Sequence, residues 1–292
     1  MITHPEKLLF PADGITKGEL AAYYDDVSDV MLPHLRKRPI TMERFPAGID
    51  QPGFIQKDVS KGFPEWLKRI EAPKKDGIVH YPSAGDRRSL AWLANQNTVA
   101  LHIWASRAPS LDRPDLCVFD LDPSRDEPDI LRAAAIGLRD LLDELGFASW
   151  VKTSGSKGFH IAVPLKARTT YDQSSAFAHR VAKMLVERDP THLTLEFSKA
   201  DRGGRILIDI ARNRAGATFV APYSVRAKAG APVSAPCSWE EVERGLVGPR
   251  SFSLRTMAER VRKVGDLWLP LTKRATSSRS LSGRAPASRK RR

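Results

Sequence analysis

The sequence predicts an α+β fold built around a ferredoxin-like sheet, and two observations support this prediction. Between residues 116 and 211, strand-like runs and helices with one apolar face follow the order β-α-β-β-α-β, which is the order of the split βαβ fold. The 292 residues are also 41% hydrophobic, which is enough for a substantial buried core. We expect a palm-like sheet on which acidic residues from neighbouring strands can converge.

The first part of the chain predicts an N-terminal α/β subdomain. One helix is expected to begin after a Thr16 cap and to end at Pro33, because its apolar residues recur at helical spacing. Residues 39–59 alternate like a strand that its prolines interrupt. A turn-rich stretch then extends to about Ser89, and residues 90–107 predict a helix that leads into a strand.

The elements of the predicted palm follow in chain order. Leu116 to Leu121 is the first strand, and residues 130–145 form an amphipathic helix with Gly146 as its stop. The strands SWVKT and FHIAVPL follow, joined by SGSKG, and a second helix covers about Asp172 to Val186. Short strands at LTLEF and RILIDIA complete the order.

Composition and charge narrow the class of protein. No apolar run reaches the roughly 20 residues of a membrane span, and the N-terminus has no signal-peptide layout, so we expect a cytoplasmic protein with no membrane partner. Cys117 and Cys237 show no C-x-x-C spacing, which argues against a zinc site or a disulfide framework.

The positive charge is concentrated at the C-terminus. Eight of the 47 Lys and Arg residues fall in the last 20 residues, and subtracting them from the net charge of +13 leaves +5 for the rest. We therefore expect a folded domain over residues 1–272 and a disordered basic tail over residues 273–292. The tail fits a nucleic-acid-binding arm and a solubilising extension equally well, while the charge of the body modestly favours a polyanionic partner.

Two acidic residues end the first palm strand. Asp120 and Asp122 flank one leucine in FDLDPS, and residues i and i+2 of a strand share a face, so their carboxylates should lie close and repel. Alone, this pair could simply end the strand and cap the next helix. Asp209, however, lies between two isoleucines, where an unpaired acid is costly to bury. If the strands are neighbours, three carboxylates meet and can bind two Mg²⁺ or Mn²⁺ ions, as in phosphoryl transfer.

A glycine-rich turn and several cations could complete such a site. The segment TSGSKGFH joins two palm strands next to the D-x-D strand and can hold phosphates, although a Ser- and Gly-rich hairpin needs no ligand to explain it. Arginine suits bidentate phosphate contact, and a histidine flanked by Leu101 and Ile103 fits a site or a hydrogen-bonded core position. The candidates are Ser154, Lys157, His160, Arg212, Arg226 and His102.

Three motifs stand in order along the chain: FDLDPS, SGSKGFH and IDIARN. Before them come the blocks ITKGELAAYY, RKRPITMERFPAG, GFIQKD and LANQNTVALHIWASR. In this combination the chain resembles the polymerase domain of bacterial DNA ligase D, a member of the archaeo-eukaryotic primase superfamily, from about Pro5 to about Leu271. The resemblance implies a primase-polymerase fold with an RRM-like palm. It also implies a DNA-directed nucleotidyltransferase that extends primers at gaps or double-strand-break ends, in non-homologous end joining or gap-filling repair.

The resemblance also implies roles for individual residues. The acids Asp120, Asp122 and Asp209 become ligands of two Mn²⁺ or Mg²⁺ ions, with Mn²⁺ preferred. The residues that would contact the triphosphate of the incoming nucleotide are Ser154, Lys157, His160 and Arg212, and His102 and Arg226 would occupy further active-site positions. The preferred nucleotide would be a ribonucleotide. DNA contacts fall to Lys17, Phe54, Lys57 and Arg202, where Lys17 would read a 5′-phosphate and Arg202 would lie on a mobile loop. Without the resemblance, Lys17 is an ordinary helix-start residue and Phe54 a loop hydrophobe.

The chain departs from ligase D in one respect. It lacks the K-x-D-G ligase motif, which the KKDG of residues 74–77 imitates only in part. We therefore expect a free-standing polymerase domain that depends on a separate DNA ligase, with Ku as a further partner. Its substrates would be nucleoside triphosphates and gapped, 5′-phosphorylated or broken DNA, and its place the nucleoid within the cytoplasm.

Two other classes of function fit part of the pattern. A non-catalytic module that bridges DNA ends by recognising 5′-phosphates would use Lys17 and the basic body, and it would not need the acids. A D-x-D glycosyltransferase or an aspartate phosphatase would also place acids around a metal at a strand end. Phosphatases of that type usually follow the second Asp with Gly and Thr, here replaced by Pro123 and Ser124, and a glycosyltransferase has no need of this basic charge.

Overall fold

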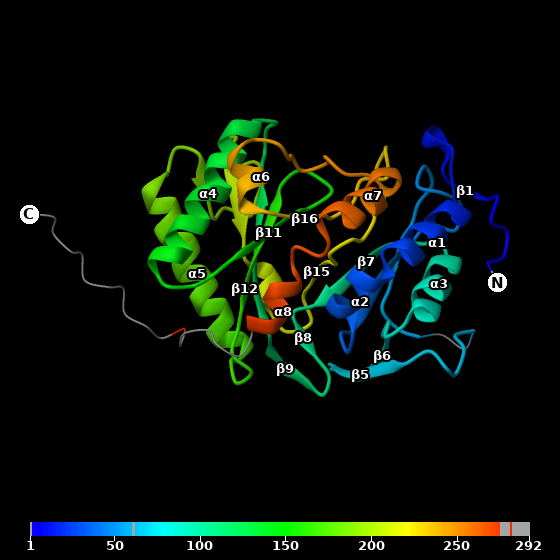
Figure 1. The fold of residues 1–292 in the computed structure, drawn as a ribbon. Helices are drawn as coiled ribbons and strands as arrows, with labels where there is room; N and C mark the ends of the chain where they lie inside the picture. Colours follow the sequence, from blue (N-terminus) through cyan, green and yellow to red (C-terminus); the bar gives the residue numbers. More distant parts are fainter. Residues whose placement is uncertain (1, 60–61, 275–280, 282–292) are drawn as a thin grey trace, which may run out of the picture.

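The computed structural model describes residues 2–59, 62–274 and 281, and two sheets form its centre (Figure 1). The larger sheet has the strand order β13-β14-β10-β12-β11-β16, with bounds Leu193–Thr194, Ile206–Asp209, Leu116–Asp122, Phe159–Pro164, Trp150–Thr153 and Pro236–Cys237. The second has the order β15-β7-β3-β4, with bounds Thr218–Val220, Thr98–Trp104, Ile40–Arg44 and Phe54–Gln56. Three two-stranded pairs complete the sheets: β1 (Leu8–Phe10) with β2 (Ile15–Thr16), β5 (Arg69–Lys74) with β6 (Gly77–Pro82), and β8 (Ser106–Arg107) with β9 (Ser110–Pro114).

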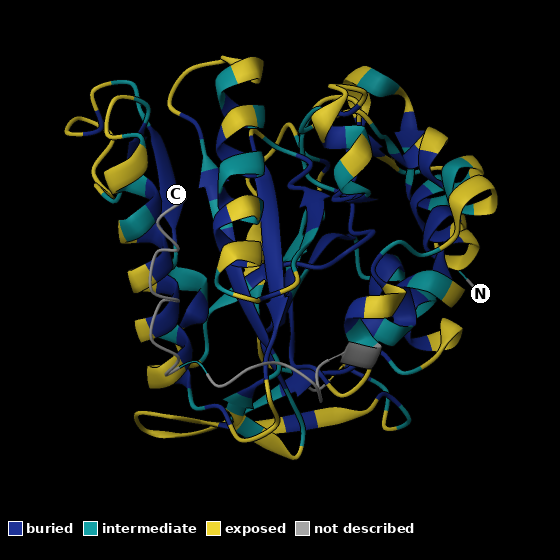
Figure 2. Cartoon of the chain, turned by 60° about the vertical axis from the view of Figure 1, so that its left-hand side comes forward, coloured by how far each residue is buried: buried dark blue, intermediate teal, exposed yellow. Residues whose placement is uncertain are grey.

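The larger sheet is the predicted palm. Its central order β14-β10-β12-β11 places the fourth palm strand beside the first, and the pairings among these strands are antiparallel, as the split βαβ order requires. Helices α4 (Pro128–Glu144) and α5 (Tyr171–Arg188) cover one face, and their exposed residues point away from the sheet (Figure 2). The α+β class and the palm predicted from the sequence are confirmed.

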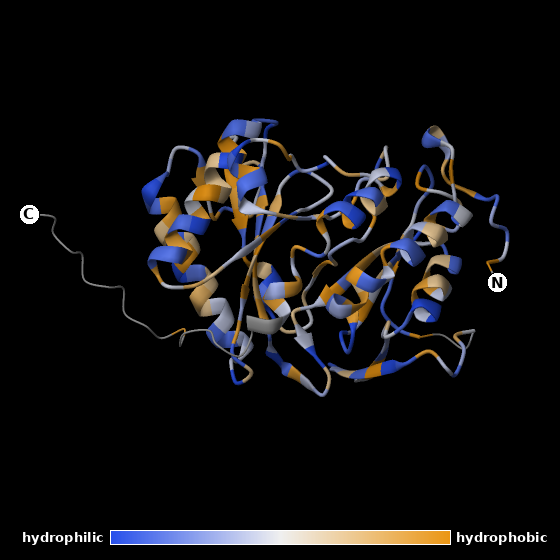
Figure 3. Cartoon of the chain, viewed as in Figure 1, coloured by the Kyte–Doolittle hydropathy of each residue, from blue (hydrophilic) through white to orange (hydrophobic). Residues whose placement is uncertain are grey.

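Apolar side chains fill the space between this sheet and its helices. Phe119 of β10 and Phe177 of α5 are fully buried, with ring centroids 6.5 Å apart, and Leu138 of α4 packs in the same cluster. The hydropathy of the chain follows this arrangement, because the palm strands are hydrophobic while both helices alternate between hydrophobic and hydrophilic stripes (Figure 3). Burial of the apolar stripes of α4 and α5 therefore holds these helices against the sheet, whose strands carry several of the site residues.

The N-terminal subdomain differs from the sequence prediction at two places. Thr16 caps the first helix as predicted, in a capping box with Glu19, but the expected single helix is two, α1 (Lys17–Asp26) and α2 (Ser28–Leu35). Pro33 lies inside α2 rather than at its end, so the helix tolerates the one intrahelical hydrogen bond that a proline cannot donate. The stretch predicted to be turn-rich contains the β5–β6 hairpin, which the prolines in both strands conceal.

The C-terminal part of the chain returns to both sheets. Strand β15 pairs with β7 of the N-terminal sheet, and β16 pairs with β11 of the palm. Helices α3 (Arg87–Asn95), α6 (Trp239–Glu243), α7 (Leu254–Val264) and α8 (Leu269–Arg274) complete the fold. The predicted folded domain ended at residue 272, whereas α8 continues to residue 274; most of the predicted basic tail, residues 275–280 and 282–292, lies outside the described residues. No helix within the described part is both long and apolar enough to cross a membrane.

Candidate active site

Three acidic side chains line one cavity at the end of two palm strands. Strands β10 and β14 are antiparallel neighbours in which Asp120 pairs with Asp209 across the ladder, so the expectation that the two strands are adjacent is confirmed. Asp122 follows on the same face of β10, as its i+2 position requires. All three residues line a cavity of about 210 Å³, and cross-strand pairing is what brings an acid of sequence position 209 beside one of position 120.

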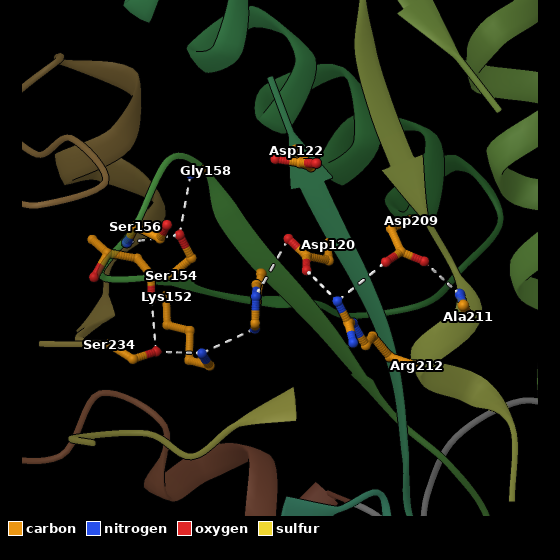
Figure 4. A network of polar contacts seen from close by, with 12 residues as sticks. Asp120, Asp122, Lys152, Ser154, Ser156, Gly158, Asp209, Ala211, Arg212 and Ser234 are labelled. Carbon is orange, nitrogen blue, oxygen red and sulfur yellow. Dashed lines mark hydrogen bonds and ion pairs between the residues drawn. The ribbon is translucent and has the colours of Figure 1, made fainter. Parts of the chain in front are cut away.

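Arg212 holds two of these acids together. It lies in the short 3₁₀ turn Ala211–Asn213 that follows β14, and its Nη2 is 3.6 Å from Asp120 Oδ2 and 3.3 Å from Asp209 Oδ2 (Figure 4). The Ala211 N–H donates to Asp209 Oδ1 at 2.8 Å. The buried Asp209 therefore has a charged partner and a backbone donor, which are the conditions under which an acid can be buried.

Asp122 stands apart from this bridge and pairs with the arginine of another loop. Figure 4 shows its carboxylate at the tip of β10, away from the chain of contacts that links Asp120 to Asp209. Arg202 Nη1 lies 3.0 Å from Asp122 Oδ2, and the same guanidinium donates to the carbonyl oxygens of Glu196 and Phe197. The side chain of Arg202 is only 4% exposed, so this residue, predicted to contact DNA, is turned inward toward the acids.

The acids have the right chemistry for divalent cations, although arginines occupy their oxygens in this arrangement. Among the described residues, no group of three or more His, Cys, Asp or Glu side chains is placed to hold a metal ion. In this arrangement the three carboxylates face guanidinium groups: Arg212 bridges Asp120 and Asp209, and Arg202 pairs with Asp122. Carboxylate oxygens are nevertheless the ligands that Mg²⁺ and Mn²⁺ prefer. A divalent ion at these acids would compete with both guanidinium groups for the carboxylate oxygens.

Asp120 is kept ionised by its surroundings. Burial alone would raise its pKa, but the nearby His160, Arg212 and Lys152 together lower that pKa to about 2. His160 Nε2 lies 3.4 Å from Asp120 Oδ1. Burial and the neighbouring Lys152 lower the pKa of His160 to about 4, so the imidazole is neutral at pH 7. A neutral imidazole beside a carboxylate acts as a hydrogen-bond donor rather than as a charge.

The glycine-rich turn forms another wall of the same cavity. Ser154 Oγ accepts hydrogen bonds from the backbone N–H groups of residues 156 and 158, both at 3.1 Å. A Cβ at residue 158 would lie 1.6 Å from the carbonyl oxygen of Leu121, so only glycine allows the turn to approach β10 this closely. Arg226 Nη1 donates to the carbonyl oxygen of Ser154 at 3.2 Å, and Lys157 also lines the cavity. The turn thus places two cations near the acids.

His102 contributes from the second sheet. It lies on β7 and lines the cavity together with three residues of β15, and its Nε2 is 3.3 Å from Glu43 Oε2. Burial lowers the pKa of His102, while its contact with Glu43 opposes that change. His102 is therefore a cavity residue with an acidic partner, and the cavity lies between both sheets.

The predicted DNA-contacting residues of the N-terminal subdomain lie outside this cavity. Phe54 is 45% exposed, and the guanidinium carbon of Arg44 lies 5.2 Å from its ring centroid. Lys57 is exposed nearby in sequence. Lys17 is 3% exposed, and its Nζ donates to Thr3 Oγ1 at 3.2 Å and to the carbonyl oxygen of Asn95 at 3.3 Å. Contact of Lys17 with a phosphate would therefore compete with these two bonds.

Sequence reasoning did not find three residues that contact this set. Arg44, which lies against the Phe54 ring, donates from Nε to the carbonyl oxygen of Gln96 at 2.8 Å. Glu43 contacts His102, and Lys152 contacts His160. A signal was available for Lys152, a single charged residue in the strand-like run SWVKT, whereas Glu43 and Arg44 are adjacent charges at a strand end and gave none.

Comparisons with known proteins agree with one another. A family model described as LigD, primase-polymerase domain, matches residues 16–268. The chain is 34% identical over 273 residues to the multifunctional non-homologous end joining protein LigD of Mycolicibacterium smegmatis, which covers 92% of this chain and 36% of that protein. It is 32% identical over 265 residues to the bifunctional non-homologous end joining protein LigD of Bacillus subtilis, covering 90% and 42%. The chain thus spans less than half the length of these curated relatives.

A solved structure is similar over nearly its whole length. The polymerase domain from Mycobacterium tuberculosis ligase D, in complex with DNA, superposes with a TM-score of 0.88 at 33% sequence identity. The match covers 94% of this chain and 98% of that one. Because the match covers 94% of this chain, it includes both sheets.

Proposed function

Since this chain belongs to the LigD primase-polymerase family, a family of polymerase-type nucleotidyltransferases, we propose that it adds nucleotides to a primer 3′ end at gaps or double-strand-break ends. The observation that carries this proposal is the meeting of three acids with Lys157 and Arg226 around one cavity. A nucleoside triphosphate needs both signs of charge: cations for its phosphates and acids for the ions that accompany them.

The cationic side of the cavity would bind the triphosphate. Lys157 and Arg226 supply charge, and the Ser154 hydroxyl can donate to a phosphate oxygen because its own oxygen already accepts two backbone hydrogen bonds. His160 would donate from Nε2, the ring nitrogen that lies 3.4 Å from Asp120 Oδ1. Arg212 would exchange its contacts with Asp120 and Asp209 for phosphate oxygens, since a guanidinium suits both partners. His102, with Glu43 as its partner, lines the cavity from the second sheet.

The acidic side would hold two Mn²⁺ or Mg²⁺ ions on Asp120, Asp122 and Asp209. When bound, such ions supply Lewis-acid stabilisation of the phosphates and of the attacking primer oxygen. Asp120 is ionised at neutral pH, as a carboxylate ligand must be. Before ions bind, Arg212 and Arg202 neutralise the acids. Assembly of the active site would therefore include the displacement of these guanidinium groups from the carboxylates.

The DNA partner and its repair context extend the same proposal. The similar domain of M. tuberculosis ligase D is in complex with DNA, which supports gapped, 5′-phosphorylated or broken DNA as the substrate here. Exposed Phe54, with Arg44 against its ring, offers a surface on which a base can stack. Non-homologous end joining, a preference for ribonucleotides and for Mn²⁺, and partnership with Ku and a separate DNA ligase belong to the proposal in its most specific form.

Primer extension tests the proposal directly. The protein is incubated with a labelled primer on a gapped duplex, with and without a downstream 5′-phosphate, with Mn²⁺ or Mg²⁺ and either nucleoside or deoxynucleoside triphosphates. We expect template-directed extension, faster with Mn²⁺ and with ribonucleotides. Absence of extension in all conditions, with DNA binding retained, would instead favour a non-catalytic end-bridging module.

The 5′-phosphate role of Lys17 needs a separate control. We expect Lys17→Ala to reduce the preference for the phosphorylated gap while leaving extension on an open template unchanged. Lys7→Ala, which changes a neighbouring lysine of the same subdomain, is the matched control. Equal preference in both variants and in the original protein would remove Lys17 from the DNA site.

A further inference from the structure

Lys152 is a buried lysine that the proposed mechanism does not use. It lies on β11, the side chain is 0% exposed, and it forms no ion pair among the described residues. Burial, together with the charge of Arg226, lowers its pKa well below the ordinary value. A buried amine is costly unless its hydrogen bonds are satisfied. The hydrogen-bond partners of Lys152 therefore indicate its role.

The contacts of Lys152 form a chain with one direction. The Ser234 hydroxyl donates to the carbonyl oxygen of Thr153 at 2.8 Å, which leaves Ser234 Oγ as an acceptor for Lys152 Nζ. On its other side, Nζ lies 3.0 Å from Nδ1 of His160. Figure 4 shows this sequence of contacts from Ser234 through Lys152 toward Asp120.

The far end of the chain decides where the imidazole proton lies. His160 Nε2 is 3.4 Å from Asp120 Oδ1, and an ionised carboxylate can only accept a hydrogen bond. A proton on Nε2 therefore makes a favourable contact, whereas a lone pair on Nε2 would face the carboxylate with two acceptors. With the proton on Nε2, Nδ1 of the neutral ring is an acceptor, and this matches a Lys152 N–H donor.

We propose that Lys152 is a positioning residue that holds His160 in its Nε2–H form, so that the ring presents a hydrogen-bond donor to the phosphates of the incoming nucleotide. Without the lysine, the ring has no partner at Nδ1 and can rotate or exchange its proton. The expected effect on the nucleotide KM rests on the proposed function, whereas the tautomer of His160 is a property of the unliganded protein. Experiments can therefore contradict the proposed function and the tautomer independently.

The tautomer is measured first, by ¹⁵N NMR of the histidine rings in the unmodified protein, with the His160 signals assigned by His160→Gln. We expect His160 with a protonated Nε2 and an unprotonated Nδ1. A proton on Nδ1 would overturn the proposal, and this result depends neither on turnover nor on the folding of a variant.

The consequence is measured in Lys152→Met, which keeps the length of the side chain but removes the amine. We expect the His160 ring signals to move between the limits of the two tautomers. The KM for the nucleotide should rise about tenfold, which is the size of effect expected for one hydrogen bond that is no longer oriented. The Kd for gapped DNA should stay within twofold. The matched control is Lys183→Met, an exposed lysine of α5, for which neither quantity should change.

A double-mutant cycle separates positioning from general support of the fold. If Lys152 acts through His160, Lys152→Met should raise the nucleotide KM in the original protein but have no further effect in His160→Gln. Equal effects of Lys152→Met in both backgrounds would mean that the lysine supports the cavity by another route. An unchanged KM in Lys152→Met would also overturn the proposal.

Discussion

Two regions of the molecule bury acidic side chains, and they do so in different ways. Asp266, before α8, accepts hydrogen bonds from His34 Nε2 at 2.8 Å, from the Tyr223 hydroxyl at 2.7 Å and from the Trp268 N–H at 2.9 Å. Its side chain is 5% exposed. One carboxylate thus receives three donors from three segments of the chain, and each donor is itself part of the folded core.

The acids of the palm have the opposite arrangement. Three carboxylates share two arginines, at distances of 3.0 to 3.6 Å, on the wall of an open cavity. These guanidinium groups come from a turn and a loop rather than from the centre of a sheet or helix. Asp266 is saturated by donors fixed in the core, whereas we expect the palm acids to exchange arginine partners for ions during the proposed reaction. This difference predicts opposite effects of substitution.

The largest expected effect is on activity at the palm. Asp209→Ala should reduce primer extension by at least about 10³-fold, equivalent to about 4 kcal/mol of transition-state stabilisation. The free energy of unfolding should fall by no more than about 1 kcal/mol, because Arg212 can still pair with Asp120. Rates on a gapped duplex and urea unfolding of the same samples measure both quantities. Extension within tenfold of the original protein would contradict the assignment of Asp209.

The next largest effect is on stability at Asp266. Asp266→Ala leaves His34 and the Tyr223 hydroxyl buried without their acceptor. Loss of one partner from a buried polar group of this kind lowers the free energy of unfolding by about 3–5 kcal/mol. We expect that loss in urea unfolding, with extension per folded molecule unchanged within threefold. Asp26→Ala, an exposed acid of α1, is the control and should change neither. A large loss of activity in folded Asp266→Ala would break the distinction between the two regions.

The two regions also differ in how far the sequence predicted them. The acids of the palm were found because their signal is local: two acids at i and i+2 of a strand, and a third between two isoleucines. The strand order then followed from the β-α-β-β-α-β succession. The arginine partners were not predicted as such, because Arg202 comes from a loop whose path no periodicity determines.

Asp266 could not be found from the sequence. It stands in the ordinary turn sequence VGDLW, and its partner His34 lies 232 positions away. The same applies to the two corrections in the N-terminal subdomain. The break between α1 and α2 and the β5–β6 hairpin depend on packing against other segments, and long-range packing overrides local propensity.

A third prediction concerns stabilisation by Mn²⁺, which should depend on the palm acids and not on Asp266. If the palm acids bind Mn²⁺, the ion should stabilise the folded protein by about 2.7 kcal/mol at 100 times its Kd, seen as a rise in Tm of a few degrees. The rise should vanish in Asp209→Ala and persist in Asp266→Ala, although the latter starts from a lower Tm. An equal rise in both variants would place the ion elsewhere.

The smallest effect is the response to acid. At Asp266, burial alone would raise the carboxyl pKa, but the hydrogen bonds and charge of His34 and the Tyr223 hydroxyl lower it below its ordinary value of 3.8. Because the folded-state pKa is the lower one, the unfolded chain binds the proton more readily. The stabilisation is fully present well above pH 3.8, and it is lost progressively as the pH falls from there through the lower folded-state pKa. The stability difference between the original protein and Asp266→Asn should therefore shrink below pH 4. A difference that stays constant to pH 3 would mean that the contacts of Asp266 do not depend on its charge.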